Sequence, residues 1–128
     1  MPRHLVSTGT PWEPIVGYSR AVRVGRHVHV AGTTAVGADG RVVGPGDARA
    51  QTLHILQVIR HALAEAGARL EDVVRTRIYV TDIRQWEAIG RVHGEIFRDI
   101  RPAATMVEVR RLIDPEMLVE IEADAIIP

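Results

Sequence analysis

The spacing of the apolar residues changes at Asp47, and this change limits the folds that the chain can adopt. Before Asp47, apolar residues alternate with a period of two over 21–24 and 27–30, and Gly25-Arg26 separates the two runs. Such alternation around two turn-forming residues predicts a β-hairpin. Its buried face is expected to consist of Val22, Val24, Val28 and Val30. Asp39-Gly40 predicts a second turn.

After Asp47 the apolar residues follow the spacing of a helix. Asp47 is a suitable N-cap and Gly67 suits the left-handed position that ends a helix, so a helix is predicted between them. Its apolar stripe consists of Ala48, Thr52, Ile55, Ile59, Ala62, Leu63 and Ala66. A second helix is predicted over 85–100, and Pro102 ends it. Its apolar face consists of Trp86, Ile89, Val92, His93, Ile96, Phe97 and Ile100.

Three further strands are predicted over 73–81, 104–109 and 118–125, where β-branched residues are frequent and alternate with others. Two amphipathic helices on one face of a single mixed sheet give an α+β fold, and 128 residues are expected to form one domain, 1–128. The opposite face of the sheet is expected to carry Glu108, Glu120 and Glu122 together with Ala104 and Met106. A face of this mixed character is either solvated or buried against another subunit.

The composition excludes some chemistry and argues against some partners. The sequence has no cysteine and no lysine, which excludes a thiolate nucleophile, a sulfur metal site and a Schiff base on the protein. Sixteen basic and sixteen acidic residues cancel, so neither nucleic acid nor an anionic membrane is an expected partner. No apolar run is long enough for a membrane span or for the core of a signal peptide, so we expect a cytoplasmic protein.

Histidines form two candidate sites. His27 and His29 project to the same side of a strand, which could hold a metal, but no further ligand lies nearby in sequence and surface strands carry such pairs by chance. His93 lies within the apolar face of the second helix, where its ring could act in acid–base chemistry or could pack with one satisfied hydrogen bond. No metal is expected.

Charged side chains give two further candidates. Glu120 and Glu122 lie two residues apart on one strand, so they could serve as acid–base groups or could face water without a function. Arg110-Arg111 with Arg101 could bind an anion or could end a solvated strand. The residues by themselves leave these alternatives open.

Six segments together resemble a known family. They occur in this order: 17–21 (GYSRA), 31–32 (AG), 65–67 (EAG), 70–82 (LEDVVRTRIYVTD), 101–105 (RPAAT) and 119–123 (VEIEA). The ordered set is similar to the Rid family of reactive-intermediate deaminases, also called YjgF-like, over essentially the whole chain. The resemblance implies a chorismate-mutase-like α+β fold and a homotrimer whose sheets turn inward, with three small-molecule clefts at the subunit interfaces. The better-known members hydrolyse 2-imino and enamine acids to 2-keto acids and ammonia without a metal or cofactor, and some relatives were labelled endoribonucleases.

The resemblance also implies roles for individual residues. Glu120 matches the glutamate that helps to position the attacking water, and Tyr18 matches a tyrosine that lines the cleft. Ala104 stands where the deaminases carry the arginine that grips the substrate carboxylate. The other expected cleft residues are Gly90, near the place of an asparagine in the deaminases, Met106 and His93.

The resemblance thus implies a small-molecule ligand, self-association and no cofactor, with weak or absent activity on 2-imino acids because of Ala104. Three functions remain open at this point. The first is hydrolysis of an imine, an enamine or a related labile metabolite, and the second is a trimer that binds a metabolite or a partner without catalysis. The third is RNA cleavage, against which the neutral charge and the lack of lysine argue.

Overall fold

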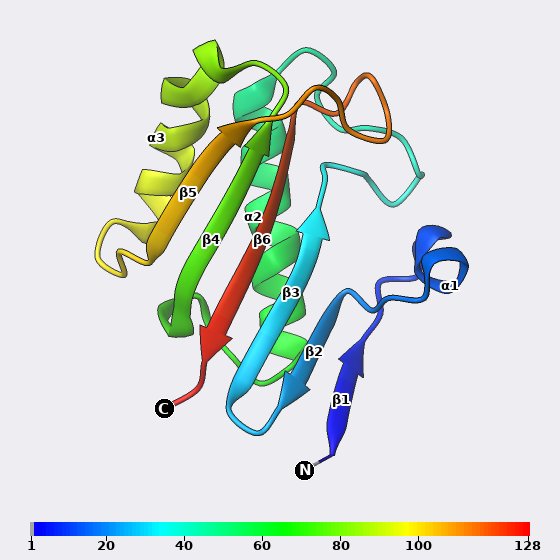
Figure 1. The fold of residues 1–128 in the computed structure, drawn as a ribbon, viewed down its shortest axis with the longest axis vertical. Coiled ribbons are helices and arrows are strands. Elements are labelled where there is room, and N and C mark those ends of the chain that lie inside the picture. Colours follow the sequence, from blue (N-terminus) through cyan, green and yellow to red (C-terminus); the bar gives the residue numbers. More distant parts are fainter. Residues whose placement is uncertain (1) are drawn as a thin grey trace.

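Six strands form one mixed sheet, and two long helices cover one of its faces (Figure 1). The computed structural model describes residues 2–128. The strands are β1 (Arg3–Val6), β2 (Ala21–Val24), β3 (His27–Thr33), β4 (Val73–Val80), β5 (Ala103–Glu108) and β6 (Val119–Ile126). The helices are α1 (Trp12–Val16), α2 (Ala48–Glu65) and α3 (Trp86–Phe97), with short 3-10 turns η1 (Leu70–Asp72) and η2 (Ile83–Gln85).

The strand order in the sheet is β1-β2-β3-β6-β4-β5, so the last strand of the chain lies in the middle. Neighbouring strands are antiparallel except β4 and β5, which are parallel because the segment containing α3 crosses from one to the other. The predicted α+β class, a mixed sheet with two helices on one face, is confirmed. No helix within residues 2–128 combines the length and the apolar character needed to cross a membrane.

Helix α2 begins and ends where its sequence predicts. The Asp47 side chain accepts a hydrogen bond from the Ala50 N–H at 3.0 Å, and Gly67 takes a φ of 86°. The predicted stripe is buried along its whole length. Gln51 is fully buried as well and accepts a hydrogen bond from the Leu118 N–H at 2.9 Å, which ties α2 to the start of β6.

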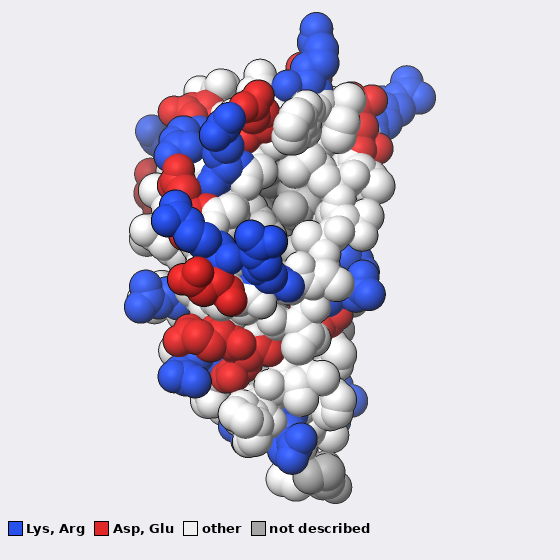
Figure 2. Space-filling model, turned by 90° about the vertical axis from the view of Figure 1, so that its left-hand side faces the viewer, with Lys and Arg blue, Asp and Glu red and all other residues white. Residues whose placement is uncertain are grey.

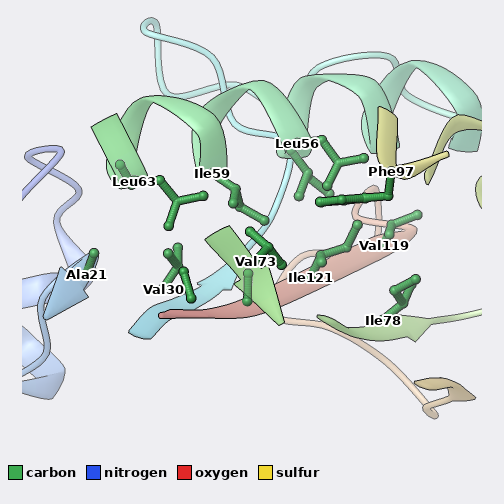
Figure 3. Packing of buried hydrophobic residues seen from close by; sticks show 14 of the residues in the cluster. Ala21, Val30, Leu56, Ile59, Leu63, Val73, Ile78, Phe97, Val119 and Ile121 are labelled. Carbon is green, nitrogen blue, oxygen red and sulfur yellow. The ribbon is translucent and has the colours of Figure 1, made fainter. Parts of the chain in front are cut away.

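The hydrophobic core lies between the two long helices and the sheet (Figure 3). Leu56, Ile59 and Leu63 point from α2 toward the sheet, where Val30 on β3 and Ile121 on β6 belong to the same cluster. Each large aliphatic side chain in this layer contributes about 1.5–3 kcal/mol by leaving water. The core therefore occupies one face of the sheet and leaves the other face open.

Helix α3 is shorter than its spacing predicts. It begins at Trp86, after η2, and ends at Phe97. Arg101 has a φ of 54°, and its N–H donates to the Phe97 carbonyl at 2.9 Å, so an arginine takes the left-handed position that usually belongs to glycine. The prediction that Trp86 joins the buried face is wrong, because Trp86 opens the helix and is 58% exposed, whereas Ile89 is buried.

The predicted buried face of the β2–β3 hairpin is also wrong in part. Val28 and Val30 are buried as expected. The turn pairs Val24 with His27, and two residues along the ladder Val22 pairs with His29. Paired residues point to the same face of a sheet, so Val22 and Val24 lie on the open face with the histidines.

The predicted placement of β5 requires a similar correction. Ala104 and Met106 were expected beside Glu120 on the open face, but they pair with Thr76 and Ile78, whose side chains are buried on the helix-covered face. Glu108 likewise pairs with the buried Val80. The prediction that Ala104, Met106 and Glu108 share one face was right. Which face they share relative to Glu120 depends on the register of β5 with β4 and of β4 with β6, and the sequence of β5 alone does not determine this register.

Candidate functional site

A cavity of about 740 Å³ lies where the C-terminal end of β3 meets α1 and the loop before β6. One part of its wall is polar and is formed by Tyr18, Arg20, Glu120 and Glu122. Another part is apolar and includes Trp12 and Ile113. Five segments that are distant in sequence, α2 among them, thus build one site.

A β-bulge in β3 shapes the polar wall. The step from Val30 to Thr33 on β3 matches a step of only two residues on β6, so β3 carries one extra residue at Ala31-Gly32. The guanidinium of Arg20 sits against this bulge. Its Nη1 donates to the Gly32 carbonyl at 2.7 Å and to the Thr33 hydroxyl at 2.9 Å.

Arg20 also holds the tyrosine of the site. Its Nη2 lies 3.2 Å from the Tyr18 hydroxyl, to which it donates, and its guanidinium carbon lies 5.5 Å from the centre of the Tyr18 ring. Arg20 is only 5% exposed. Its guanidinium is therefore nearly buried and bonded to three neighbouring groups, and we assign it a positioning role.

Glu120 lies directly over the backbone of Gly32. A methyl group placed on Gly32 would come within 2.1 Å of the Glu120 Oε2, so only glycine leaves room for the carboxylate there. Burial raises the pKa of Glu120 above its usual value, with the nearby Arg20 cation opposing and the Glu122 anion reinforcing this effect. No hydrogen bond from a donor within residues 2–128 acts on the pKa of this carboxylate. A half-buried carboxylate with these properties suits the role of a general base.

Glu122, two residues along β6, is engaged with its neighbours instead. Its Oε1 accepts a hydrogen bond from the Tyr79 hydroxyl at 2.9 Å and lies 3.5 Å from the Arg77 guanidinium. That hydrogen bond, with some burial, raises the pKa of Tyr79. The two glutamates therefore differ in kind, because Glu122 belongs to a network and Glu120 does not.

The short helix α1 is held in place by a buried carboxylate. Glu13 is 6% exposed, and its Oε2 accepts from the N–H of Thr8 at 3.3 Å and from the N–H of Thr10 at 3.2 Å, as well as from both hydroxyls. Burial acts to raise the pKa of Glu13, but these hydrogen bonds and one from Ser7 outweigh it and hold the pKa below the usual value. The Glu13 carbonyl accepts from the Tyr18 N–H at 3.1 Å, so α1 also sets the position of Tyr18.

A second group of expected site residues lies on the helix-covered face. The Nε2 of His93 lies 2.9 Å from the buried Thr76 hydroxyl, and its ring centre lies 4.6 Å from that of Phe97. Burial lowers the pKa of His93, which keeps the ring neutral near pH 7. Ala104 on the neighbouring strand pairs with the same Thr76, so Thr76 is a common neighbour of Ala104 and His93. Gly90 lies one helical turn before His93 and has open space beside it.

The structure thus divides the expected site residues between the two faces of the sheet. Tyr18 and Glu120 line the large cavity together. Gly90, His93, Ala104 and Met106 belong to the side of α3 and β5 and do not line that cavity. The two groups cannot meet within one chain.

The remaining candidates are placed as follows. His29 Nδ1 lies 2.8 Å from Asp124 on the open face, and no three His, Asp or Glu side chains of residues 2–128 are arranged to hold a metal ion. Arg101 lies before β5 and lines a smaller cavity of about 380 Å³ with His93, whereas Arg110-Arg111 follow the other end of that strand. The three arginines therefore do not form one anion site.

Sequence reasoning did not single out Trp12, Glu13 or Arg20. The available signal for Arg20 was its place beside Ala21 at the start of a strand, where a charged residue next to a buried one requires a partner. Trp12 and Glu13 follow a proline in a segment that has no apolar period, so nothing local marked Trp12 as part of the cavity wall or Glu13 as the residue that holds α1.

The chain is similar to known proteins over almost its whole length. The model of a family described as endoribonuclease L-PSP matches residues 8–127. The chain is similar to the 3-aminoacrylate deaminase RutC of Acinetobacter baylyi, with 37% identity over 126 residues and 98% of each chain covered. It is similar to the solved structure of Rv2704 from Mycobacterium tuberculosis, a member of the YjgF/YER057c/UK114 family, with 54% identity, a TM-score of 0.90, and 98% of this chain and 100% of that chain covered. A putative endoribonuclease from Thermotoga maritima is 28% identical, with a TM-score of 0.86 and 100% and 99% of the two chains covered.

Proposed function

Since the chain belongs to the endoribonuclease L-PSP (YjgF-like) family, we propose that it hydrolyses the C=N bond of a small imine or enamine in the large cavity. The observation that carries the proposal is the Glu120 carboxylate, which is half-buried against Gly32 and faces the cavity without a hydrogen-bonding partner among the described residues. The similarity to a 3-aminoacrylate deaminase supports the same class of reaction. No cofactor is part of the proposal.

The proposed reaction adds water across a protonated imine. Glu120 accepts a proton from water as the water oxygen bonds to the imine carbon, which forms a carbinolamine. The protonated Glu120 then returns the proton to nitrogen, and the C–N bond breaks as the carbinolamine hydroxyl gives its proton to Glu120. Glu120 passes this proton to the departing ammonia or to water, so the net products are the carbonyl compound and ammonium. An enamine enters the same path after a proton adds to its carbon. Burial raises the pKa of Glu120, and the Arg20 cation favours its ionised form by opposing this rise.

Activity on 2-imino acids is proposed to be weak. Ala104 cannot donate hydrogen bonds to a substrate carboxylate, and losing one partner of a buried charged pair costs about 2–5 kcal/mol. At about 1.4 kcal/mol per tenfold, the deficit is on the order of 10²-fold or more in kcat/KM relative to an arginine-bearing deaminase.

The protein is expected to be a homotrimer. Its open sheet face leaves apolar side chains uncovered, with Leu5 55%, Val24 37% and Val107 43% exposed. The edge strand β5 carries no charge from Ala103 to Val107, and an uncharged edge invites pairing with another chain. Association would also bring together the two residue groups that one chain keeps apart. Sedimentation equilibrium should give three times the chain mass of 14.1 kDa, and a monomer or dimer mass would contradict this.

RNA cleavage is the second candidate, because the family description and the Thermotoga maritima relative carry that label. The charges argue against it, since the formal net charge is zero. On the side of α3 and β5, basic and acidic side chains are interspersed and much of the remaining surface is uncharged (Figure 2).

Imine hydrolysis can be tested directly. An amine oxidase or an amino-acid oxidase generates the imine in the assay, and semicarbazide competes for it before spontaneous hydrolysis. The wild-type protein is expected to lower semicarbazone formation and to speed ammonia release relative to an assay without it. If neither the imines made by the amine oxidase nor those made by the amino-acid oxidase are hydrolysed faster with the protein present, the proposed function is wrong. A parallel incubation with single-stranded RNA should leave the RNA intact.

A further inference from the structure

The apolar part of the large cavity is extensive and partly uncovered. Trp12 and Val16 of α1, Val36 and Val58 line it together with Ile113 from the loop before β6. Val16 is 71% exposed and Ile113 is 70% exposed. Two large aliphatic side chains at one cavity, each mostly in contact with water, indicate a ligand that brings a hydrocarbon group to them.

The polar part of the cavity offers nothing that would grip a carboxylate. Arg20 supplies the one guanidinium in the lining among residues 2–128, but it is only 5% exposed and already donates to the Gly32 carbonyl, the Thr33 hydroxyl and the Tyr18 hydroxyl at 2.7, 2.9 and 3.2 Å, so it does not present a free pair of donors to a carboxylate. The remaining basic group is the single imidazole of His61, which lacks the paired donors of a guanidinium.

The acidic groups of the cavity reinforce this selectivity. Glu120 and Glu122 both face it, so a ligand carboxylate would meet two like charges. A protonated nitrogen would meet the opposite situation, because Glu120 accepts no hydrogen bond from the described chain and only the nearly buried Arg20 cation opposes a second positive charge there. The electrostatics and the apolar wall therefore select for the same chemical class.

We propose that the cavity takes an amine-derived imine that has an apolar substituent and no carboxylate. Its protonated C=N group lies against Glu120, and its hydrocarbon group lies against Trp12 and Ile113. The inference rests on the proposed function and narrows it, because it assigns the substrate to the aldimines or ketimines of simple apolar amines rather than to 2-imino acids.

Binding can be measured with a pair of probes that differ only in a carboxylate. Trp12 lines the cavity and the exposed Trp86 is the other tryptophan, so Trp86→Phe leaves Trp12 fluorescence as the reporter. Phenethylammonium is expected to bind at least about tenfold more tightly than L-phenylalanine. Equal or tighter binding of L-phenylalanine, or no binding of either probe at millimolar concentration, overturns the inference.

A matched pair of variants tests the contact with the hydrocarbon group. Ile113→Ser should weaken phenethylammonium binding about five- to tenfold, since it removes apolar area that the ligand covers. Ile15→Ser is the control, because Ile15 is 79% exposed and does not line the cavity. Equal affinities of the two variants would overturn the assigned position of the hydrocarbon group.

Turnover separates the inference from the proposed function. The two substrates are 2-phenylethanimine, made from phenethylamine by an amine oxidase, and 2-imino-3-phenylpropanoate, made from phenylalanine by an amino-acid oxidase. Preference for the first in kcat/KM supports both ideas. A higher kcat/KM for 2-imino-3-phenylpropanoate supports imine hydrolysis but overturns the proposed ligand class. A guanidinium from a neighbouring copy of the chain would then bind the substrate carboxylate. If phenethylammonium binds preferentially but neither imine is turned over, the proposed ligand class stands and the proposed imine hydrolysis is wrong.

Discussion

Replacing Glu120 with glutamine is expected to lower kcat/KM for imine hydrolysis by about 10²–10⁴-fold. Glutamine has nearly the same shape, so the contact with Gly32 and the cavity volume are retained while the proton acceptor is lost. In the wild type, kcat/KM should rise with pH through the pKa of Glu120, which burial raises above 4.5, and this limb of the profile should disappear in Glu120→Gln.

The control for this substitution is Glu122→Gln. Glu122 lies on the same strand and lines the same cavity, but it is bonded to Tyr79 and Arg77, so its loss should reduce kcat/KM less than tenfold. Comparable losses in the two variants would assign the effect to the charge of the cavity and not to proton transfer. Activity of Glu120→Gln within about threefold of the wild type would remove Glu120 from the mechanism.

Glu120→Gln should also stabilise the fold. A carboxyl group whose folded pKa is raised binds its proton more tightly in the folded state, so it favours folding below its unfolded pKa and opposes folding as pH rises above it. At pH 7 the charged form therefore costs stability that glutamine does not. Thermal unfolding at pH 7 should show a Tm higher by about 2–4 °C, and the difference should vanish near pH 4.

Arg20→Met is expected to destabilise the protein by about 1–3 kcal/mol for each buried acceptor that it leaves without a partner. Arg20 is 5% exposed and donates to the Gly32 carbonyl and the Thr33 hydroxyl, so its removal leaves buried acceptors without partners at the bulge. It also removes the cation that opposes the rise in the pKa of Glu120. Urea unfolding at a fixed protein concentration measures the loss.

Arg26→Met provides the comparison for Arg20→Met. Arg26 occupies the exposed turn of the β2–β3 hairpin, and surface substitutions of this kind change stability by no more than about 0.5 kcal/mol. If Arg20→Met unfolds at the same urea concentration as Arg26→Met, water replaces the guanidinium at the bulge and the structural role assigned to Arg20 is wrong.

The elements that the sequence predicts well are those determined by local signals. Helix α2 has an N-cap at Asp47, a glycine at its end and an uninterrupted stripe, and all three are found in the structure. The hairpin turn at Gly25-Arg26 is local in the same sense. Strand β1 and helix α1 went unpredicted because four and five residues are too few for a period to emerge.

The phase of one strand against another could not be predicted, because it depends on long-range pairing. Alternation with a period of two predicts correctly that Ala104 and Met106 lie on the same face of the sheet. Which face this is depends on how β5 pairs with β4 and β4 with β6, and this pairing places Glu120 on the opposite face. The arrangement of the candidate site could not be predicted for the same reason, since its residues come from segments that only long-range pairing brings together. Tyr18 was identified through the family resemblance, and Glu120 through its spacing with Glu122 as well as the resemblance. Their proximity to Arg20 follows from a bulge that the sequence marks only with a glycine.

The bulge in β3 also keeps the core pattern of this strand in phase. Val28, Val30 and Thr33 all point into the core, although the last step between them is three residues and not two. In a regular strand, residues three apart lie on opposite faces, so the extra residue of the bulge is what returns Thr33 to the core side. Deleting one residue between Val30 and Thr33 would restore regular pairing and leave both side chains inside, but it would remove the backbone carbonyl arrangement to which the Arg20 guanidinium donates. A shortened β3 would therefore keep the core and lose the support of the polar wall of the cavity.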